Sequence, residues 1–190
     1  MRTARILLKK MWTTKKRKMK RTGMLLWVLP LLLSAGCIKE KNYEKIEQDA
    51  ISNYLKNNNI SVAPTASGLY YVELKAGSGA RPEDGDTVYI NYIAYKLTGL
   101  VLDTNLEDVA RQYGLPTEGR SFKPFGFVKG SGEVIAGLDE GVGYMREGGQ
   151  ATLVMPGKLA YGNYDPLAFY VELVKVVSDT TVVPDTTSAR

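Results

Sequence analysis

The chain has 190 residues, 44% of them apolar and 24% charged, which suits one soluble domain with appendages. Its formal charge of +5 comes from residues 1–36, which hold ten Lys or Arg and no Asp or Glu. Residues 37–190 have 15 basic and 20 acidic residues and therefore carry a charge of −5. No nucleic-acid partner is expected for such an acidic domain. The sequence contains no histidine, which excludes Ser-His-Asp and Cys-His nucleophiles and zinc sites that use imidazole, and Cys37 is the only cysteine, which excludes an intrachain disulfide.

The N-terminus has the pattern of an export signal. Residues 2–21 are strongly basic, residues 24–33 (MLLWVLPLLL) form an apolar core too short for a spanning helix, and small residues precede Cys37. The segment Ser34-Ala35-Gly36-Cys37 resembles a bacterial lipobox, which implies a signal peptide over residues 1–36 and a lipid on Cys37. The resemblance places the protein in the cell envelope, facing the periplasm or on the outer membrane. The alternative is a plain secretory signal with an incidental cysteine.

Residues 37–65 are expected to form a lipidated tether followed by an amphipathic helix. The tether is the short polar stretch 38–42, and the helix ends at the asparagines 57–59. Its apolar residues recur at helical spacing: Tyr43, Ile46, Ala50, Ile51, Tyr54 and Leu55. We favour docking of this helix on the chain's own domain over docking on a partner.

The rest of the chain reads mainly as strands. Their expected ranges are 69–75, 87–96, 100–103, 122–128, 150–155 and 168–177. Two short helices are expected: residues 106–113, capped by Asn105, and residues 134–145, with Leu138, Val142 and Met145 turned inward. Several antiparallel strands with one central short helix indicate an α+β fold, and the polar residues 178–190 are expected to be a disordered tail.

One long run carries a family resemblance. Residues 125–142 read FGFVKGSGEVIAGLDEGV, which resembles the F-x-F and E-V-I-x-G-W-x-E-G motifs of the FKBP-type peptidyl-prolyl isomerases. Further motifs of that family follow in the same order: SGLY at 67–70 with GSG at 77–79, DTVYINY at 86–92, DT at 103–104, GGQ at 148–150, Pro156 with AYG at 160–162, and FYVEL at 169–173. The resemblance covers residues 66–177 and is specific because so many motifs coincide in order.

The resemblance implies an antiparallel sheet wrapped around one short helix, with the predicted N-terminal helix as an addition. It also implies a pocket for proline-containing polypeptide. Its matched catalytic positions are Asp103, Tyr92, Tyr161 and Ile135, and its matched substrate-binding positions are Phe125, Glu133, Val134, Leu138, Phe169 and Leu102.

The implied reaction is rotation about an X–Pro bond, whose barrier of about 18–20 kcal/mol reflects lost amide resonance. No bond is cleaved, so neither a nucleophile, a metal nor a cofactor is required. A dry cavity that fits the twisted amide better than the planar forms would accelerate the rotation. Asp84-Gly85-Asp86 and Asp139-Glu140 lack the spacing of a calcium loop, so no metal site is expected.

The sequence departs from the family pattern at three places. Leu138 replaces the Trp of the pocket floor, Leu102 replaces a Phe, and the loop after the AYG motif is cut to residues 163–166, while the connection 106–121 is longer than usual. The first hypothesis, which the matched motifs favour, is an isomerase that assists the folding of exported proteins. The alternatives are a non-catalytic FKBP-like chaperone or scaffold, and a structural lipoprotein subunit of an envelope complex.

Overall fold

The computed structural model describes the backbone of residues 29–178 and the side chains of residues 42–178. Most of the predicted signal peptide and nearly all of the predicted tail lie outside this range, as does the side chain of Cys37. The elements in chain order are α1 (Leu29–Asn57), β1 (Tyr70–Lys75), β2 (Thr87–Lys96), β3 (Val101–Thr104), α2 (Glu107–Gln112), β4 (Phe125–Val128), α3 (Ala136–Tyr144), β5 (Gln150–Met155), the 3-10 turn η1 (Gly157–Leu159) and β6 (Leu167–Val177). Among the described helices, none is long and apolar enough to cross a membrane.

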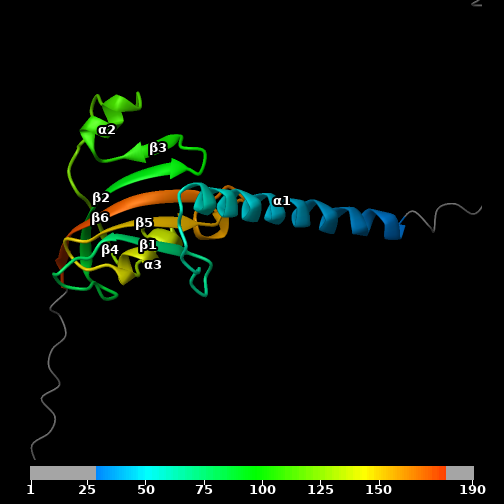
Figure 1. The fold of residues 1–190 in the computed structure, drawn as a ribbon, viewed down its shortest axis with the longest axis horizontal. Helices are drawn as coiled ribbons and strands as arrows, with labels where there is room; N and C mark the ends of the chain where they lie inside the picture. Colours follow the sequence, from blue (N-terminus) through cyan, green and yellow to red (C-terminus); the bar gives the residue numbers. More distant parts are fainter. Residues whose placement is uncertain (1–28, 179–190) are drawn as a thin grey trace, which may run out of the picture. The chain divides into compact units, whose positions relative to one another are not determined.

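The six strands of the described range form one antiparallel sheet. Its order is β1-β5-β6-β2-β3, and β4 pairs with β2 beside this path. The long strands β2 and β6 pair along their whole length in the middle of the sheet (Figure 1). The predicted α+β class is confirmed, and the alternation of Val88, Ile90 and Ala94 into the core follows the period of two that the sequence shows.

The core lies between α3 and one face of the sheet. Leu138, Val142 and Met145 of the α3 region are buried against strand residues such as Ile90 and Leu153, as the sequence predicts. The helix comes very close to β5, because a Cβ on Gly141 would lie 2.4 Å from the Leu153 side chain. Gly137 and Gly141, the two glycines of α3 that face β5 residues, therefore set the distance between helix and sheet.

The last turns of α1 pack on the opposite face of the sheet. Ile51 is buried against Val154 and Ala168, with Tyr54 and Leu55 beside it. These strand residues alternate with core residues, so they point away from α3. The predicted docking of this helix on its own domain is confirmed for this end.

The beginning of α1 differs from the prediction in two ways. The expected polar tether at 38–42 is helical, because residues 38–56 contain neither Gly nor Pro and are rich in good helix formers. Ile46, predicted on the apolar face, is 62% exposed, and the buried residue of this turn is Glu47 instead. The face of α1 that packs on the domain at this turn is thus not the face that the apolar residues predict.

Asn105 was predicted as a helix cap, and this prediction is wrong. The residue before α2 is Leu106, which makes no side-chain cap hydrogen bond. Asn105 is buried instead: its Oδ1 accepts the Tyr92 N–H at 2.8 Å, and its Nδ2 donates to the carbonyl oxygens of Ile90 at 3.0 Å and Lys123 at 2.9 Å. The side chain therefore fastens both ends of the segment between β3 and β4 to strand β2.

Candidate functional site

A pocket of about 270 Å³ opens where the start of α3 meets the sheet. Strands β2, β3, β4 and β6 each contribute to its walls, and the turn after η1 contributes one residue. The lining residues are Tyr92, Ala94, Asp103, Phe125, Glu133, Val134, Ile135, Leu138, Tyr161 and Phe169. The catalytic and substrate-binding positions matched from the sequence thus meet in one cavity, with one exception.

The exception is Leu102, which does not line this pocket. Its side chain is 37% exposed, and successive residues of a strand point to opposite faces, so Leu102 points away from its neighbour Asp103. Ala94, a buried residue of β2 outside the matched motifs, lines the pocket in addition.

Three aromatic rings shape the walls. Tyr92 meets Phe125 edge to face at 6.1 Å between ring centroids and stacks on Phe169 at 6.2 Å. Phe125 in turn stacks on the buried Phe127, which belongs to the core. Such ring pairs prefer edge or offset arrangements, which hold the walls in defined orientations and keep the interior apolar.

The floor comes from the start of α3. Ile135 is the extended residue before the helix, and its carbonyl accepts the N–H groups of Leu138 and Asp139 at 3.0 and 3.2 Å. The Glu133 carboxylate accepts the Val128 N–H at 3.3 Å, which ties this entry to strand β4. The first N–H groups of a helix have no intrahelical acceptor, so the start of α3 brings backbone donors close to the lining residues Val134 and Ile135.

Asp103 and Glu133 are the two acidic residues of the pocket, and two side-chain donors hold the Asp103 carboxylate. The Tyr92 hydroxyl donates to its Oδ2 at 2.6 Å, and Arg120 Nη2 donates to its Oδ1 at 2.6 Å. Burial raises the pKa of Asp103, but the hydrogen bonds from Tyr92 and Arg120 outweigh it, so the pKa lies below its ordinary value. The same arrangement raises the pKa of Tyr92, first through burial and then through its bond to Asp103. At neutral pH the pocket therefore holds a carboxylate and a neutral phenol.

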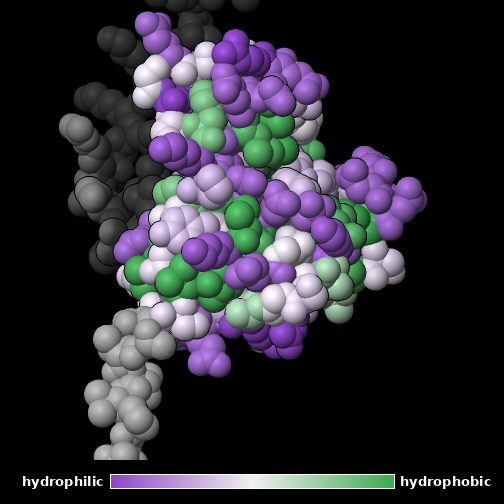
Figure 2. Space-filling view, turned by 90° about the vertical axis from the view of Figure 1, so that its left-hand side faces the viewer, coloured by the Kyte–Doolittle hydropathy of each residue, from purple (hydrophilic) through white to green (hydrophobic). Residues whose placement is uncertain are grey.

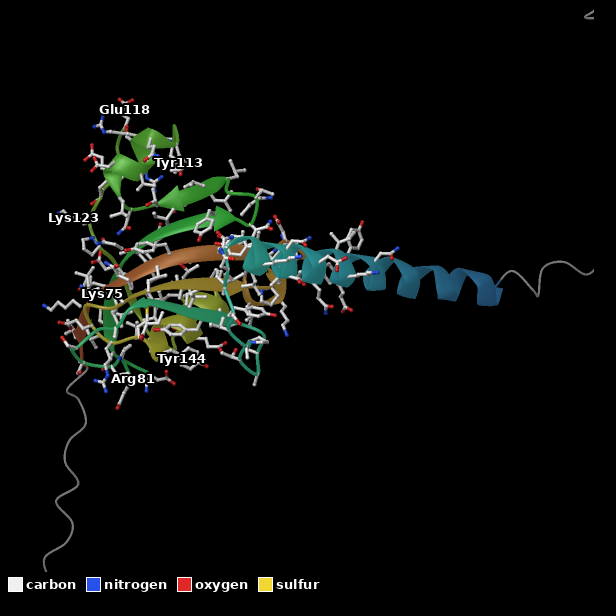
Figure 3. The ribbon with its side chains drawn as sticks, viewed as in Figure 1. Lys75, Arg81, Tyr113, Glu118, Lys123 and Tyr144 are labelled. Carbon is white, nitrogen blue, oxygen red and sulfur yellow. The ribbon has the colours of Figure 1, made fainter. Side chains whose placement is uncertain are left out.

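Sequence reasoning missed Arg120. It lies on the long segment between β3 and β4. Figure 3 shows Tyr113 and Glu118 of this segment away from the sheet, and Lys123 where the chain returns toward it. Besides Asp103, Arg120 Nη2 reaches the Thr104 carbonyl at 3.0 Å, and its guanidinium lies over the Phe122 ring. The unusual length of this segment was the only available signal, and length alone does not indicate which basic residue turns back.

Tyr161 is the most exposed of the aromatic residues of the site. Its side chain is 69% exposed and reaches the pocket from the short turn after η1. Only four residues lie between this turn and β6, so within the described residues no long loop follows Tyr161.

Fold and pocket together define an α+β domain that offers a ligand an aromatic cavity lined also by the acidic residues Asp103 and Glu133. A sequence model described as FKBP-type peptidyl-prolyl cis-trans isomerase matches residues 79–174, and the chain belongs to this family.

Named relatives agree with this assignment. The chloroplastic peptidyl-prolyl cis-trans isomerase FKBP16-3 of Arabidopsis thaliana is 40% identical over 103 residues, which is 54% of this chain and 40% of that protein. The isomerase FkpA of Escherichia coli is 32% identical over 155 residues, 73% of this chain and 52% of FkpA. The crystal structure of Escherichia coli FkpA superposes with a TM-score of 0.52 at 25% identity, covering 85% of this chain and 75% of that one. The chain spans about half the length, or less, of these curated relatives.

Proposed function

We propose that this protein catalyses cis-trans rotation of X–Pro bonds in polypeptides. The observation that carries the proposal is the pocket of about 270 Å³ in which Tyr92, Asp103, Ile135 and Tyr161 surround an apolar space. This combination fits a prolyl ring and its preceding amide, and family membership supports it.

Rotation of the X–Pro bond requires from the protein only a cavity of suitable shape and polarity. Rotation needs the amide to lose its planarity, against a barrier of about 18–20 kcal/mol, and a site that excludes water and fits the twisted form lowers that barrier. Phe125, Phe169 and Val134 would hold the prolyl ring. The Ile135 N–H and the Tyr161 hydroxyl would donate to substrate carbonyls, and ionised Asp103 would stabilise the charge distribution of the twisted amide.

A second candidate is a non-catalytic chaperone or scaffold module. Two observations favour it. Tyr161 is exposed, which leaves one side of the pocket open, and Leu138 at the floor is smaller than the Trp of the family pattern. A pocket open to water binds an extended chain but desolvates the amide less completely.

One titration separates the two candidates. An X–Pro peptide is added to the isotope-labelled full chain, and its binding and its cis-trans exchange are both measured by NMR. An enzyme accelerates exchange at concentrations where it binds; a binding module shifts the pocket resonances of Phe125 and Phe169 without acceleration.

We further propose that the protein is anchored in the cell envelope through a lipid on Cys37 and acts on exported polypeptides. The basic and apolar N-terminal residues and the small residues before Cys37 support this. Growth with a labelled fatty acid should mark the protein, and Cys37→Ser should remove the label. An equally labelled variant would contradict the proposed attachment site.

A structural envelope subunit would need a large apolar face for its partner. In the view of Figure 2 the hydrophobic residues form separate patches divided by hydrophilic ones, so that side of the domain does not favour this third reading.

A further inference from the structure

A buried carboxyl group on α1 holds the turn that carries Tyr161. Glu47 is only 9% exposed, and its Oε1 accepts the backbone N–H of Gly157 at 2.5 Å, although the two residues are 110 positions apart. No ion pair to Glu47 is present among the described side chains. Burying a carboxyl group is unfavourable unless hydrogen bonds compensate for the lost water, so this bond is a specific contact rather than an incidental one.

Gly157 is the residue around which the turn is wound. Its carbonyl accepts the N–H groups of Ala160 at 3.0 Å and Gly162 at 2.8 Å, the two neighbours of Tyr161. A Cβ on Gly157 would lie 1.5 Å from the Asn163 carbonyl oxygen, so the chain folds back directly onto this residue. Fixing Gly157 therefore fixes the backbone on both sides of Tyr161.

The far end of the same turn also touches α1. The ring of Tyr43 stacks on that of Tyr164, with centroids 5.8 Å apart and 18° between the planes. Beyond it, Lys96 of β2 pairs with Asp165 at 2.8 Å. The helix thus holds the turn at residues on either side of Tyr161.

Between these contacts the helix and the turn line an open cavity. A cavity of about 500 Å³ is lined by Glu44, Glu47 and Gln48 from α1 and by Pro156, Gly162 and Tyr164 from the turn. The turn is therefore held by a few point contacts and not by continuous packing. Loss of one contact leaves the turn room to move, because the described side chains of α1 do not pack against it along its whole length.

We propose that α1 is a positioning element of the isomerase site and that Glu47 is its positioning residue. Glu47 touches no substrate; through Gly157 it keeps the Tyr161 hydroxyl at the rim of the pocket. This inference rests on the proposed isomerase function.

The test compares Glu47→Ala with Glu47→Gln in the full chain. The alanine variant lowers kcat/KM about tenfold, since a displacement of about 1 Å in a contact group is enough for such a loss. The glutamine variant retains most of the activity, because its amide oxygen still accepts the Gly157 N–H. Asp49→Ala, at an exposed position on the same helix, is the matched control and leaves kcat/KM unchanged.

A double-mutant cycle separates positioning from general stability. If Glu47 acts through Tyr161, Glu47→Ala has little further effect in a Tyr161→Phe background. A loss of equal size in both backgrounds overturns the proposal, as does full activity of Glu47→Ala. Should Glu47→Ala fail to fold, Tyr43→Ala takes its place, since Tyr43 is exposed and contacts the same turn.

Amide hydrogen exchange gives a readout that does not depend on turnover. Glu47→Ala should speed exchange at residues 157–163 while the amides of β5 and β6 stay protected. If the wild-type chain shows no isomerase activity, the proposed function fails, and this measurement alone decides whether Glu47 orders the turn. Unchanged exchange at residues 157–163 overturns the positioning role in either case.

Discussion

The hydroxyl of Tyr92 donates a 2.6 Å hydrogen bond to the carboxylate of Asp103, and the ring of the same tyrosine stacks on Phe169. One side chain therefore joins the apolar wall to the charged group. Tyr92→Phe keeps the ring and removes the donor, so we expect the pKa of Asp103 to rise toward its ordinary value. Carbon NMR of the Asp103 carboxyl group measures this. Tyr95→Phe removes a hydroxyl that bonds Tyr54 outside the pocket and serves as control; an unmoved Asp103 titration in Tyr92→Phe would contradict the assigned cause.

The lowered pKa of Asp103 makes a prediction for stability against pH. A carboxyl group whose pKa is lower in the folded than in the unfolded state stabilises the fold above its unfolded value, here 3.8, and loses that effect as pH falls through the folded value. Asp103→Asn should therefore be less stable than wild type at pH 7, and the difference should shrink below pH 3.8. Urea unfolding at both pH values tests this. A stability difference between the two proteins that grows on acidification would contradict a lowered pKa of Asp103 in the folded state.

Arg120 is expected to matter for the site and little for the fold. Its pair with Asp103 is partly exposed, and ion pairs of this kind contribute little to stability because solvent screens them. Arg120→Leu should nevertheless raise the pKa of Asp103 and lower kcat/KM about tenfold, as for loss of a group that orients a polar contact. Arg111→Leu removes an ion pair with Glu107 inside α2 and should change neither quantity. Equal effects of the two variants would remove the special role of Arg120.

The two phenylalanines of the pocket should separate binding from stability. Phe169 is 5% exposed and packs in the core, so Phe169→Ala should destabilise the domain by about 3–5 kcal/mol. Phe125 is 42% exposed, and Phe125→Ala should cost about 1 kcal/mol or less while raising KM for an X–Pro peptide. Chemical unfolding and peptide titration of both variants check the contrast. A large stability loss in Phe125→Ala would show that this ring is core rather than pocket wall.

Gly141 tests how closely α3 must approach the sheet. An added methyl group would meet the Leu153 side chain at 2.4 Å, so Gly141→Ala should destabilise the domain by about 1–3 kcal/mol despite the better helix propensity of alanine. Gly143→Ala meets only the flexible end of Lys129 and should be neutral or stabilising by up to about 1 kcal/mol. Thermal unfolding ranks the two variants. Equal melting temperatures would mean that the core accommodates the extra volume.

Local pattern was sufficient for the parts of the fold that have a period. The bounds of β2 and β5 match the predicted ranges. Alternation indicates β2, and the glycines 148–149 and Pro156 flank β5. The pocket residues were recovered from ordered motifs, and only Leu102 points elsewhere. Asn105, Glu47 and Arg120 could not be assigned in this way. Their partners are the backbone of β2, the Gly157 N–H and the Asp103 carboxylate, and no sequence period links such distant groups.

The most direct test of the central claim is a prolyl cis-trans exchange assay on the full chain and on an Asp103→Ala, Tyr161→Phe double variant whose folding has been verified. We expect the wild-type chain to accelerate exchange of an X–Pro peptide and the double variant to lose that acceleration. A folded wild-type chain that binds the peptide without accelerating exchange would contradict the proposed isomerase activity and support the alternative of a binding module.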